Sequence, residues 1–273
     1  MANYDISKYI DIKPSEVRAL IRAGEIKIPT AGMCRGYAQA NLVILPADYA
    51  ADFEQFAANN PFPCPILEIT RGVPFTHDMG EGNLVTDIPE YFIYRNGVFS
   101  ERCYDASKYF EDGMVGFLIG CSFSFEEALM RAGIEVRHIA TGRNVPMYKT
   151  NIMTKPAGPF SGPTVCSMRP MTPENAKLAY DITVKMPNVH GAPVHIGDPS
   201  EIGIKDVMKP DYGEAVDIYP GEVPVFWPCG VTPQAAVENA KPPIVITHSP
   251  GHMFITDIPN SELNDYLENK KNK

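Results

Sequence analysis

Two segments of the 273-residue chain share one pattern, and this internal repeat constrains the fold more than any other feature. In each copy an apolar run ends at a cysteine, a hydroxyl residue follows three positions later, and a short helical segment leads to an apolar run that ends in histidine. The copies cover 117–138 and 225–248, and Met-x-x-Thr-Asn/Asp segments follow them at 147–151 and 253–257. The copies lie too far apart for a solenoid, so the repeat predicts two β-turn-α-β units related by a pseudo-twofold axis.

The residues between these landmarks predict the elements of each copy. Ile134–His138 and Ile244–His248 are expected to be the strands that end in histidine. Ser124 and Glu127 have the spacing of a capping box, and Thr232 stands directly before a proline. Both are patterns of a helix N-terminus, so we expect each short helix to be capped by its hydroxyl residue.

The N-terminal part of the chain predicts a strand-helix-strand unit. A short helix with Pro14 at its first position comes first and closes at Gly24. An apolar run at 41–45, a helix that starts at Pro46 and a second apolar run at 65–70 then follow. Strands this apolar, joined by a helix, are typical of a buried parallel sheet.

The stretch between the two copies has a pattern of its own. A strand is predicted at 162–169, a helix capped by Thr172 runs to Lys185, and a second strand is predicted at 193–196. The sequence therefore predicts a mixed α/β fold in two parts: a main α/β domain of residues 1–151 plus 217–273, and an inserted small α+β domain of residues 152–216.

Composition narrows the classes of function. With 33 acidic and 24 basic residues the net charge is −9, which excludes nucleic acid as the main partner. The apolar run at 114–125 is too short to span a membrane, and the N-terminus has no signal-peptide pattern. Six scattered cysteines without a Cys-x-x-Cys pair fit reduced thiols in a cytoplasm. The lysine-rich segment 267–273 is expected to be a solvated tail.

Cys121 and Cys229 are the first candidates for chemistry. Each is predicted to lie between a strand end and a helix start, where free N–H groups and the helix dipole bind anions and lower a thiol pKa. Two such turns brought together would line an anion-binding cleft and supply donors to an oxyanion. The alternative is that both are buried packing residues, which is the common role of a free cysteine.

Four of the six histidines lie in two loops rich in proline and glycine: His190, His195, His248 and His252. Proline and glycine exclude a helical zinc pair. The four are candidates for general acids and bases, or else they simply hydrogen-bond the turns that carry them. A divalent metal is possible though not required, and its ligands would come from these histidines with Asp198 and Asp257.

Arg143 and Arg169 each follow a predicted strand. At such a position a guanidinium can bind a substrate carboxylate with two hydrogen bonds. The alternative for either is a structural ion pair with one of the acidic residues. The predicted substrate-binding residues are Arg143, Asn144, Arg169, Tyr148, Gln39 and Asn41.

Several long phrases resemble the D-glutamate cyclase family, over nearly the whole chain from the first helix to Asp257. They include Gly120–Leu129, Asn144–Tyr148, His190–Pro199, Gly221–Trp227 and Cys229–Gln234. The resemblance implies a three-layer α/β/α body with a smaller two-layer part. It also implies a hydro-lyase, since a eukaryotic member removes water from D-glutamate to give 5-oxo-D-proline. One departure is Cys34-Arg35, where the resemblance leads us to expect Ala-Pro.

The expectation is therefore a cytoplasmic lyase that dehydrates D-glutamate or a related small carboxylic acid, with a homodimer possible. Two alternatives stay open from the sequence. The first is a dehydratase of another hydroxy acid, acting through a metal-bound or histidine-assisted hydroxyl. The second is a non-catalytic binding protein for a small carboxylate such as 5-oxoproline, since helix-end anion sites serve both binding and catalysis.

Overall fold

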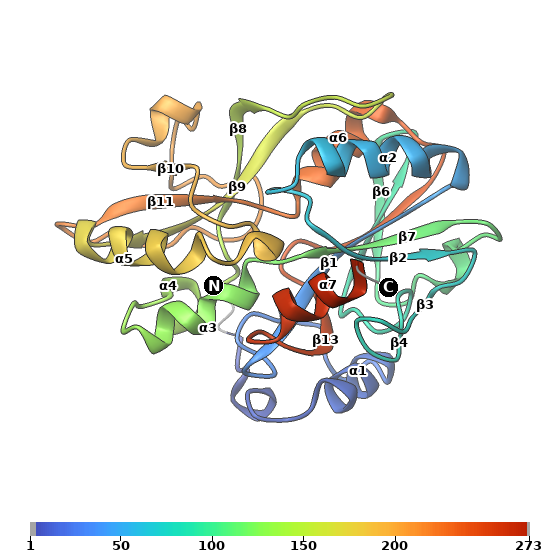
Figure 1. Cartoon of the computed structure of the whole chain (residues 1–273), viewed down its shortest axis with the longest axis horizontal. Coiled ribbons are helices and arrows are strands. Elements are labelled where there is room, and N and C mark those ends of the chain that lie inside the picture. The colour runs from blue at the N-terminus through green and yellow to red at the C-terminus, as the bar shows by residue number, and fades with distance from the viewer. Residues whose placement is uncertain (1–3, 272–273) are drawn as a thin grey trace.

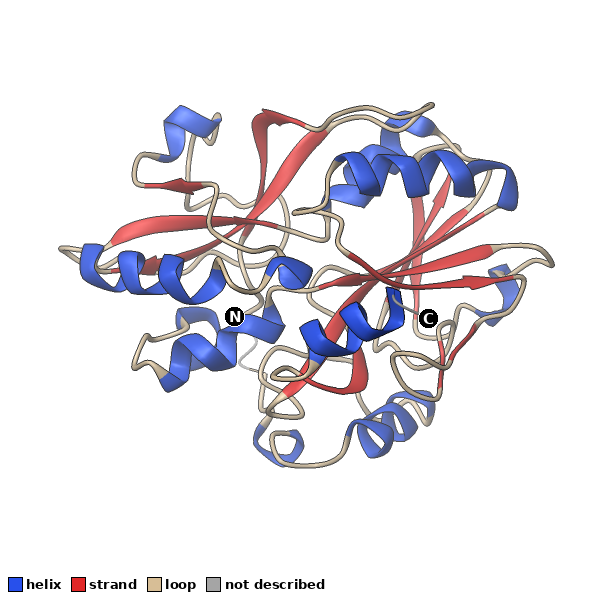
Figure 2. Cartoon of the chain, viewed as in Figure 1, coloured by secondary structure: helices blue, strands red, loops and turns tan. Residues whose placement is uncertain are grey.

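The computed structural model of the chain describes residues 4–271, and it confirms a mixed α/β fold (Figures 1 and 2). A seven-stranded sheet has the order β2-β7-β1-β12-β5-β6, with β13 also paired to β1. Its strands are β1 (Tyr37–Leu45), β2 (Ile66–Arg71), β5 (Tyr91–Arg95), β6 (Val98–Cys103), β7 (Val115–Gly120), β12 (Val245–His248) and β13 (Phe254–Pro259).

A second sheet has the order β10-β11-β9-β8, and a small hairpin pairs β3 with β4. These strands are β3 (Phe75–Thr76), β4 (Gly82–Asn83), β8 (Met147–Met153), β9 (Pro163–Met171), β10 (His195–Ile196) and β11 (Val223–Pro228). The second sheet thus takes strands from both sides of the expected insert 152–216 as well as from within it. The division into a main domain and an insert stays a prediction.

The helices pack on both faces of the first sheet. The α-helices are α1 (Pro14–Arg22), α2 (Ala47–Asn59), α3 (Phe123–Arg131), α4 (Arg137–Ala140), α5 (Pro173–Thr183), α6 (Thr232–Ala240) and α7 (Leu263–Lys271). Four short 3₁₀ helices are η1 (Ser7–Tyr9), η2 (Ser107–Tyr109), η3 (Pro187–Val189) and η4 (Pro199–Ile202).

Alternate residues of β1 face two separate cores, because successive side chains of a strand point to opposite faces. Val43 and Leu45 pack with Phe53 of α2 and Val237 of α6. Leu42 and its neighbours on the other face pack with residues of α3, α5 and α7. Figure 1 shows α2 and α6 above this sheet and α7 below it. A strand buried on both faces explains why the run at 41–45 is uniformly apolar.

The predicted parallel pairing is wrong, because every strand pair in the described part of the chain is antiparallel. The helix α2 does return the chain so that β2 runs in the same direction as β1. However, β7 lies between them and pairs antiparallel with both. Uniform burial of both faces, which usually marks a parallel strand, here results from helices on both sides of an antiparallel sheet.

The strand pairing relates the two copies of the repeat when each is counted with the Met-x-x-Thr segment that follows it. In the first sheet Ala40 of β1 lies opposite Gly120 of β7 on one side and Phe254 of β13 on the other. The strand β7 leads into α3, whereas β13 comes from the second copy, after α6. A central strand is therefore flanked by one strand from each copy of the repeat.

The second sheet repeats this arrangement with the copies exchanged. Cys166 of β9 lies opposite Pro228 of β11 and Tyr148 of β8. Here β11 leads into α6, whereas β8 comes from the first copy, after α3. Each copy thus gives its first strand to one sheet and its last strand to the other, which ties the two sheets together at the turns that precede α3 and α6.

The prediction that the Ser124 and Thr232 hydroxyls cap the two helices is wrong. Each hydroxyl instead accepts a hydrogen bond from a neighbouring strand. The helices begin at Phe123 and Thr232, so Ser124 lies inside the first turn of α3. The Ser124 hydroxyl accepts a hydrogen bond from the backbone N–H of Gln39 in β1 at 3.0 Å. The Thr232 hydroxyl accepts one from the N–H of Val165 in β9, also at 3.0 Å. Each hydroxyl therefore ties its helix to the central strand of a sheet.

One further prediction is wrong, and another holds only in part, since Glu268 and Asn269 are exposed but Leu267 is not. The segment 134–138 is not a strand but enters the short helix α4, in which Arg137 and His138 are buried. Arg137 is held there by an ion pair with Glu222 at 2.6 Å. The segment at 267 and beyond continues α7, whose Leu267 packs into the core; residues 272–273 lie outside the described residues. The alternation of polar and apolar residues at 134–138 did not reveal that Arg137 and His138 would be buried.

Other predicted features are confirmed. Pro14 is the first residue of α1, and the Thr172 hydroxyl caps α5 by accepting from the Asn175 N–H at 3.3 Å. Between residues 4 and 271, no helix combines the length and the apolar character that crossing a membrane would require.

The two hydroxyl ties are expected to stabilise the fold. Ser124→Ala or Thr232→Ala leaves a buried backbone N–H without its acceptor, which costs about 1–3 kcal/mol. Urea denaturation of each variant measures this loss of the free energy of unfolding. Ser15→Ala, at an exposed position of α1, is the control and should change stability by less than about 0.5 kcal/mol. Losses as small as the control's at both hydroxyl sites would contradict this role.

Candidate active site

The two cysteine turns meet at the junction of the sheets. Cys121 and Cys229 lie in one buried apolar cluster, together with the repeat-related pair Met147 and Met253. Each cysteine follows a strand and precedes a helix, as the sequence predicts. Burial raises the pKa of the Cys121 thiol well above its usual range and that of Cys229 to about 11. These environments favour the packing alternative over a reactive thiolate.

A buried ion pair lies beside this cluster. Arg169 of β9 contacts the carboxylate of Glu126 of α3, and the Arg169 Nε–Glu126 Oε1 distance is 3.1 Å. The same guanidinium donates to Ser167 Oγ and Ser122 Oγ, each at 3.0 Å. Both charged side chains are 1% exposed. The structural ion pair, one of the two alternatives for Arg169, is thus what the structure contains.

Glu126 has a second basic neighbour. His138 Nε2 lies 3.1 Å from Glu126 Oε1, and the Phe123 ring stacks on the His138 ring. Burial alone would raise the pKa of Glu126, but His138 and Arg169 outweigh it and hold this pKa below its ordinary value. The Glu126 Oε2 atom has no hydrogen-bond partner among residues 4–271. Glu126 is therefore a deprotonated carboxylate with one buried oxygen that makes no hydrogen bond to the described residues.

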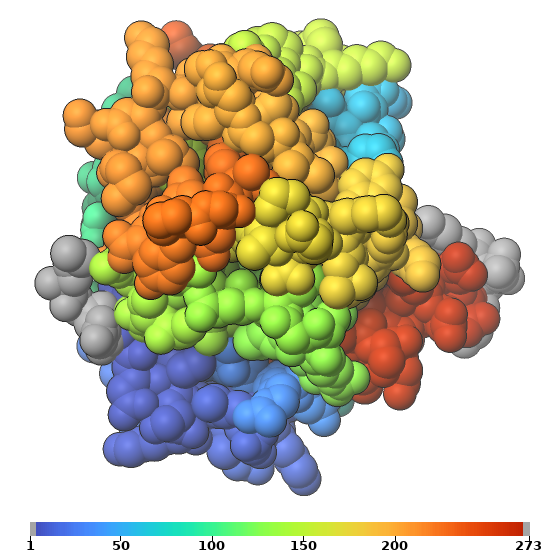
Figure 3. All heavy atoms as spheres, turned by 90° about the vertical axis from the view of Figure 1, so that its left-hand side faces the viewer, coloured from blue at the N-terminus to red at the C-terminus, as the bar shows by residue number. Residues whose placement is uncertain are grey.

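Glu126 lines a cavity of about 500 Å³. One wall is a single face of α3, made by residues at helical spacing from Phe123 to Arg131. The facing residues come from the loop 32–37, Gln39, Ile139, Asn260 and the segment around η1. The volume is in the range of small-molecule sites in proteins. In Figure 3 the N-terminal segment (blue) and the segment that contains α3 (green) lie directly against each other.

The loop at the cavity is firmly held. The Cys34 N–H donates to Tyr9 O at 2.9 Å, and the Arg35 N–H donates to Ile10 O at 2.6 Å. Cys34 has a φ of +47°, a left-handed conformation that few non-glycine residues adopt. Gln39 accepts from the Thr30 hydroxyl at 2.8 Å and donates to the Thr30 carbonyl at 3.0 Å. The polar wall of the cavity is thus fixed before any ligand binds.

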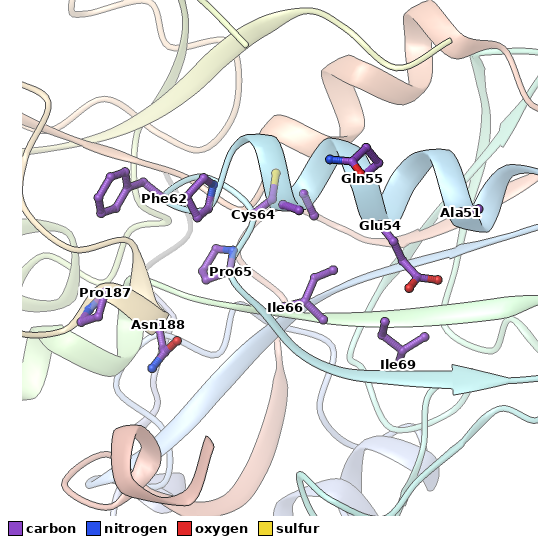
Figure 4. Close-up of a pocket in the computed structure, with 13 residues that line it drawn as sticks. Ala51, Glu54, Gln55, Phe62, Cys64, Pro65, Ile66, Ile69, Pro187 and Asn188 are labelled. Carbon is purple, nitrogen blue, oxygen red and sulfur yellow. The ribbon is translucent and has the colours of Figure 1, made fainter. Parts of the chain in front are cut away.

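A larger cavity, of about 910 Å³, lies between α2, β2 and η3 (Figure 4). Figure 4 shows Phe62, Pro187 and Asn188 at one end of it, and Glu54 farther along α2. Glu54 is its one charged lining residue among those described, and it is paired with Arg71 at 2.6 Å. A third cavity, of about 520 Å³, surrounds the β3–β4 hairpin. Neither contains a predicted site residue, so the 500 Å³ cavity is the better candidate.

The structure does not gather the four histidines. His190 and His248 are fully buried, and burial lowers the pKa of each to about 4. His190 Nδ1 lies 2.7 Å from the Phe62 carbonyl oxygen, and His248 Nδ1 contacts the backbone of Leu42. The Nε2 atom of each is without a hydrogen-bond partner in the described part of the chain.

The other two histidines also bind turns. His252 lies on the same turn as His248, its Nδ1 is 3.2 Å from the Pro250 carbonyl oxygen, and burial lowers its pKa. His195 is at the edge of the second sheet, with Nε2 at 2.7 Å from the Asp198 carbonyl oxygen. None of the four histidines is among the described residues that line the 500 Å³ or the 910 Å³ cavity.

The residues named for a metal do not fit one. Asp257 binds both terminal nitrogens of the Arg18 guanidinium, at 3.0 and 2.7 Å. The Asp198 carboxylate caps η4 by accepting from the Ser200 N–H at 2.9 Å. Among the residues that the structure describes, no group of three His, Cys, Asp or Glu side chains is placed to hold a metal ion. No step below involves one.

The remaining predicted residues make structural contacts. Arg143 donates to Ala215 O at 2.7 Å, and Asn144 donates to Pro250 O at 2.9 Å. The Tyr148 hydroxyl donates to Val207 O at 2.5 Å inside a separate core of the second sheet. Asn41 donates to Gly120 O at 2.7 Å. Of the predicted set, Gln39 lines the 500 Å³ cavity, and Arg169 contacts it through Glu126.

Sequence reasoning missed Glu126 and His138 as site residues. The repeat held the signal, because these two occupy the positions of Gln234 and His248 in the second copy. In that copy the Gln234 side chain donates to the His248 carbonyl oxygen at 2.9 Å. A comparison of the two copies, position by position, would have shown that only the first carries a carboxylate beside its histidine.

The sequence profile of the D-glutamate cyclase family matches residues 115–257, and the chain belongs to this family. It is 52% identical over 261 residues to a protein of Stutzerimonas stutzeri (strain A1501) named "Putative hydro-lyase", with 95% of this chain and 98% of that protein covered. It is 56% identical over 252 residues to "Putative hydro-lyase YcsI" of Bacillus subtilis (strain 168), with 92% of this chain and 98% of that protein covered. These matches support a lyase.

The buried ion pair should be sensitive to loss of one partner. Arg169→Met leaves the Glu126 carboxylate buried without one of its two basic partners, which costs about 3–5 kcal/mol in the free energy of unfolding. Urea denaturation measures it. Arg131→Met removes the exposed i,i+4 partner of Glu127 and should cost less than about 1 kcal/mol. If the two variants lost the same free energy of unfolding, the buried pair would stabilise the fold no more than the exposed pair does.

The buried histidines predict a pH dependence of stability. Between about pH 6.5 and 4 the unfolded chain binds protons that folded His190 and His248 do not, so stability falls as the pH falls. Each contributes at most about 1.4 kcal/mol per pH unit. The urea midpoints at pH 6.5 and pH 5.0 should differ less in His190→Gln and His248→Gln than in the wild type. His195→Gln, which changes a partly exposed histidine, is the control and should show the wild-type difference. Unchanged slopes in the first two variants would refute this assignment.

Proposed function

We propose that this lyase dehydrates D-glutamate to 5-oxo-D-proline in the 500 Å³ cavity, with Glu126 as the group that moves protons. The observation that carries the proposal is the Glu126 side chain, which lines the cavity, is held deprotonated and has a buried Oε2 without a hydrogen-bond partner among the described residues. Membership of the D-glutamate cyclase family supports the choice of reaction. The volume suits a five-carbon amino acid.

The reaction places a definite demand on the site. The substrate nitrogen carries three protons, and it attacks the γ-carboxyl carbon only after it has lost one. A C–N bond forms, a C–O bond breaks, and the oxygen leaves as water. One of the three protons stays on the lactam nitrogen and two leave with the oxygen, so the site consumes no proton but must move two.

Glu126 meets the first part of that demand. A general base must be deprotonated at the working pH and within reach of the proton that it takes. The Arg169 contact and the neighbouring His138 keep Glu126 deprotonated, while its Oε2 has no partner among the described residues. Once protonated by the substrate ammonium, the same carboxyl is the acid that can protonate the leaving oxygen.

His138 is placed to assist the second proton transfer. Its Nε2 is 3.1 Å from Glu126 Oε1 and makes no hydrogen bond in the described part of the chain, so a rotation of the ring that aligns the two groups would let a proton pass between them. The acid–base role that the sequence assigned to the four loop histidines therefore goes to Glu126 and His138 in this proposal. The turn at Cys121 does not supply the expected oxyanion donors, because the N–H groups of Phe123, Ser124 and Phe125 already donate to Cys121 and Ser122.

Conversion of D-glutamate by the purified protein, followed by chiral chromatography, tests the proposal. Glu126→Gln keeps the size of the side chain but cannot take a proton, so the rate should fall roughly 100-fold or more. Glu54→Gln, which changes a carboxylate of the 910 Å³ cavity, should keep the wild-type rate.

Three outcomes would count against the proposal. Full activity of Glu126→Gln would remove the assigned base. Binding of 5-oxo-D-proline without any conversion of D-glutamate would favour a binding protein. Conversion of a hydroxy acid in place of D-glutamate would favour the other dehydratase.

A further inference from the structure

We propose that Arg35, at the 500 Å³ cavity, binds the carboxylate that substrate and product share and so makes this site selective for a free α-carboxylate. The inference rests on the proposed function, because only the α-carboxylate passes through the cyclisation unchanged. Arg35 lines the same cavity as Glu126, and its side chain is 59% exposed. A guanidinium can bind a carboxylate with two parallel hydrogen bonds.

Charge pairing within the cavity singles out Arg35. The Glu126 carboxylate is matched by Arg169, behind the cavity wall. The Glu127 carboxylate is matched by Arg131 at 2.6 Å and also accepts from the Asn260 side chain. Both acidic residues of the wall are therefore paired. The positive charge of Arg35 has no carboxylate partner among the described residues of the cavity itself.

The partner that Arg35 does have is easily displaced. Its Nε lies 3.5 Å from Asp11 Oδ1, and the Asp11 side chain is 75% exposed. An exposed pair at this distance contributes little, so a ligand carboxylate can take the place of Asp11 at small cost. Arg131 is a weaker candidate, because a ligand would have to compete with its closer contact to Glu127.

The backbone fixes where Arg35 emerges. Its N–H donates to Ile10 O, and the preceding Cys34 is buried with a left-handed φ of +47°. The next residue, Gly36, is left-handed too, and a Cβ built on it would lie 3.6 Å from the Glu127 carboxylate. The loop is thus close to α3 and firmly anchored, so ligand binding has to order the Arg35 side chain but not the backbone that carries it.

Calorimetric titration with two product-like rings tests this without need of turnover. The first ring is 5-oxo-D-proline, and the second is 2-pyrrolidinone, which is the same lactam without the carboxylate. Wild-type protein should bind the first roughly 10- to 100-fold more tightly, since a charge-assisted hydrogen bond contributes that much. Arg35→Gln should lose most of this preference, and Arg35→Lys should keep part of it.

The control is Lys8→Gln, which removes a nearby surface charge outside the cavity lining and should keep the preference. The inference is overturned if Arg35→Gln binds 5-oxo-D-proline as the wild type does, if Arg131→Gln alone removes the preference, or if the wild type does not prefer the carboxylate. A parallel conversion assay separates the two proposals. If D-glutamate is converted but binding of 5-oxo-D-proline does not depend on Arg35, only this inference is contradicted. If binding depends on Arg35 but D-glutamate is not converted, only the proposed function is contradicted.

Discussion

The contact between Arg169 and Glu126 joins the two halves of the protein. Arg169 belongs to the central strand of the second sheet, and Glu126 belongs to the helix that follows a strand of the first sheet. Two charges this deeply buried are tolerable because Glu126 Oε1 contacts both His138 and Arg169, and because the guanidinium also donates to the hydroxyls of Ser122 and Ser167. The same contact keeps the carboxylate deprotonated at a cavity, so one interaction serves both the fold and the proposed chemistry.

The exchange of strands between the copies explains why this contact forms where it does. Each copy starts in one sheet and ends in the other, so both β-to-helix turns must lie at the junction. The Ser124 and Thr232 hydroxyls hold the two helices against the central strands. The copies then differ in what they place beside their histidine: Glu126 beside His138, but Gln234 beside His248. Only the first copy therefore has a carboxylate that can take up and release a proton beside its histidine, because the amide of Gln234 cannot do so.

Much of the fold follows from the sequence, but little of the site does. Apolar runs, proline positions and the Thr172 cap locate strands and helices, because these signals are local. The direction of neighbouring strands is not local: β7 lies between β1 and β2 through pairs of residues such as Ala40 and Gly120 that are far apart in the sequence. The site was harder still. Gln39 was predicted as a substrate-binding residue, whereas Glu126 lies in a helical segment whose sequence is that of an ordinary amphipathic helix.

The central claim is that the reaction takes place in the cavity between Gln39 and Glu126. A crystal structure of the protein with 5-oxo-D-proline tests it most directly, since this ligand is also the proposed product. The account predicts the lactam ring within hydrogen-bond distance of the Glu126 carboxylate and the ligand carboxylate on Arg35. A ligand bound in the 910 Å³ cavity beside α2, or at the turn that carries His248 and His252, with the Glu126 cavity empty, would contradict it.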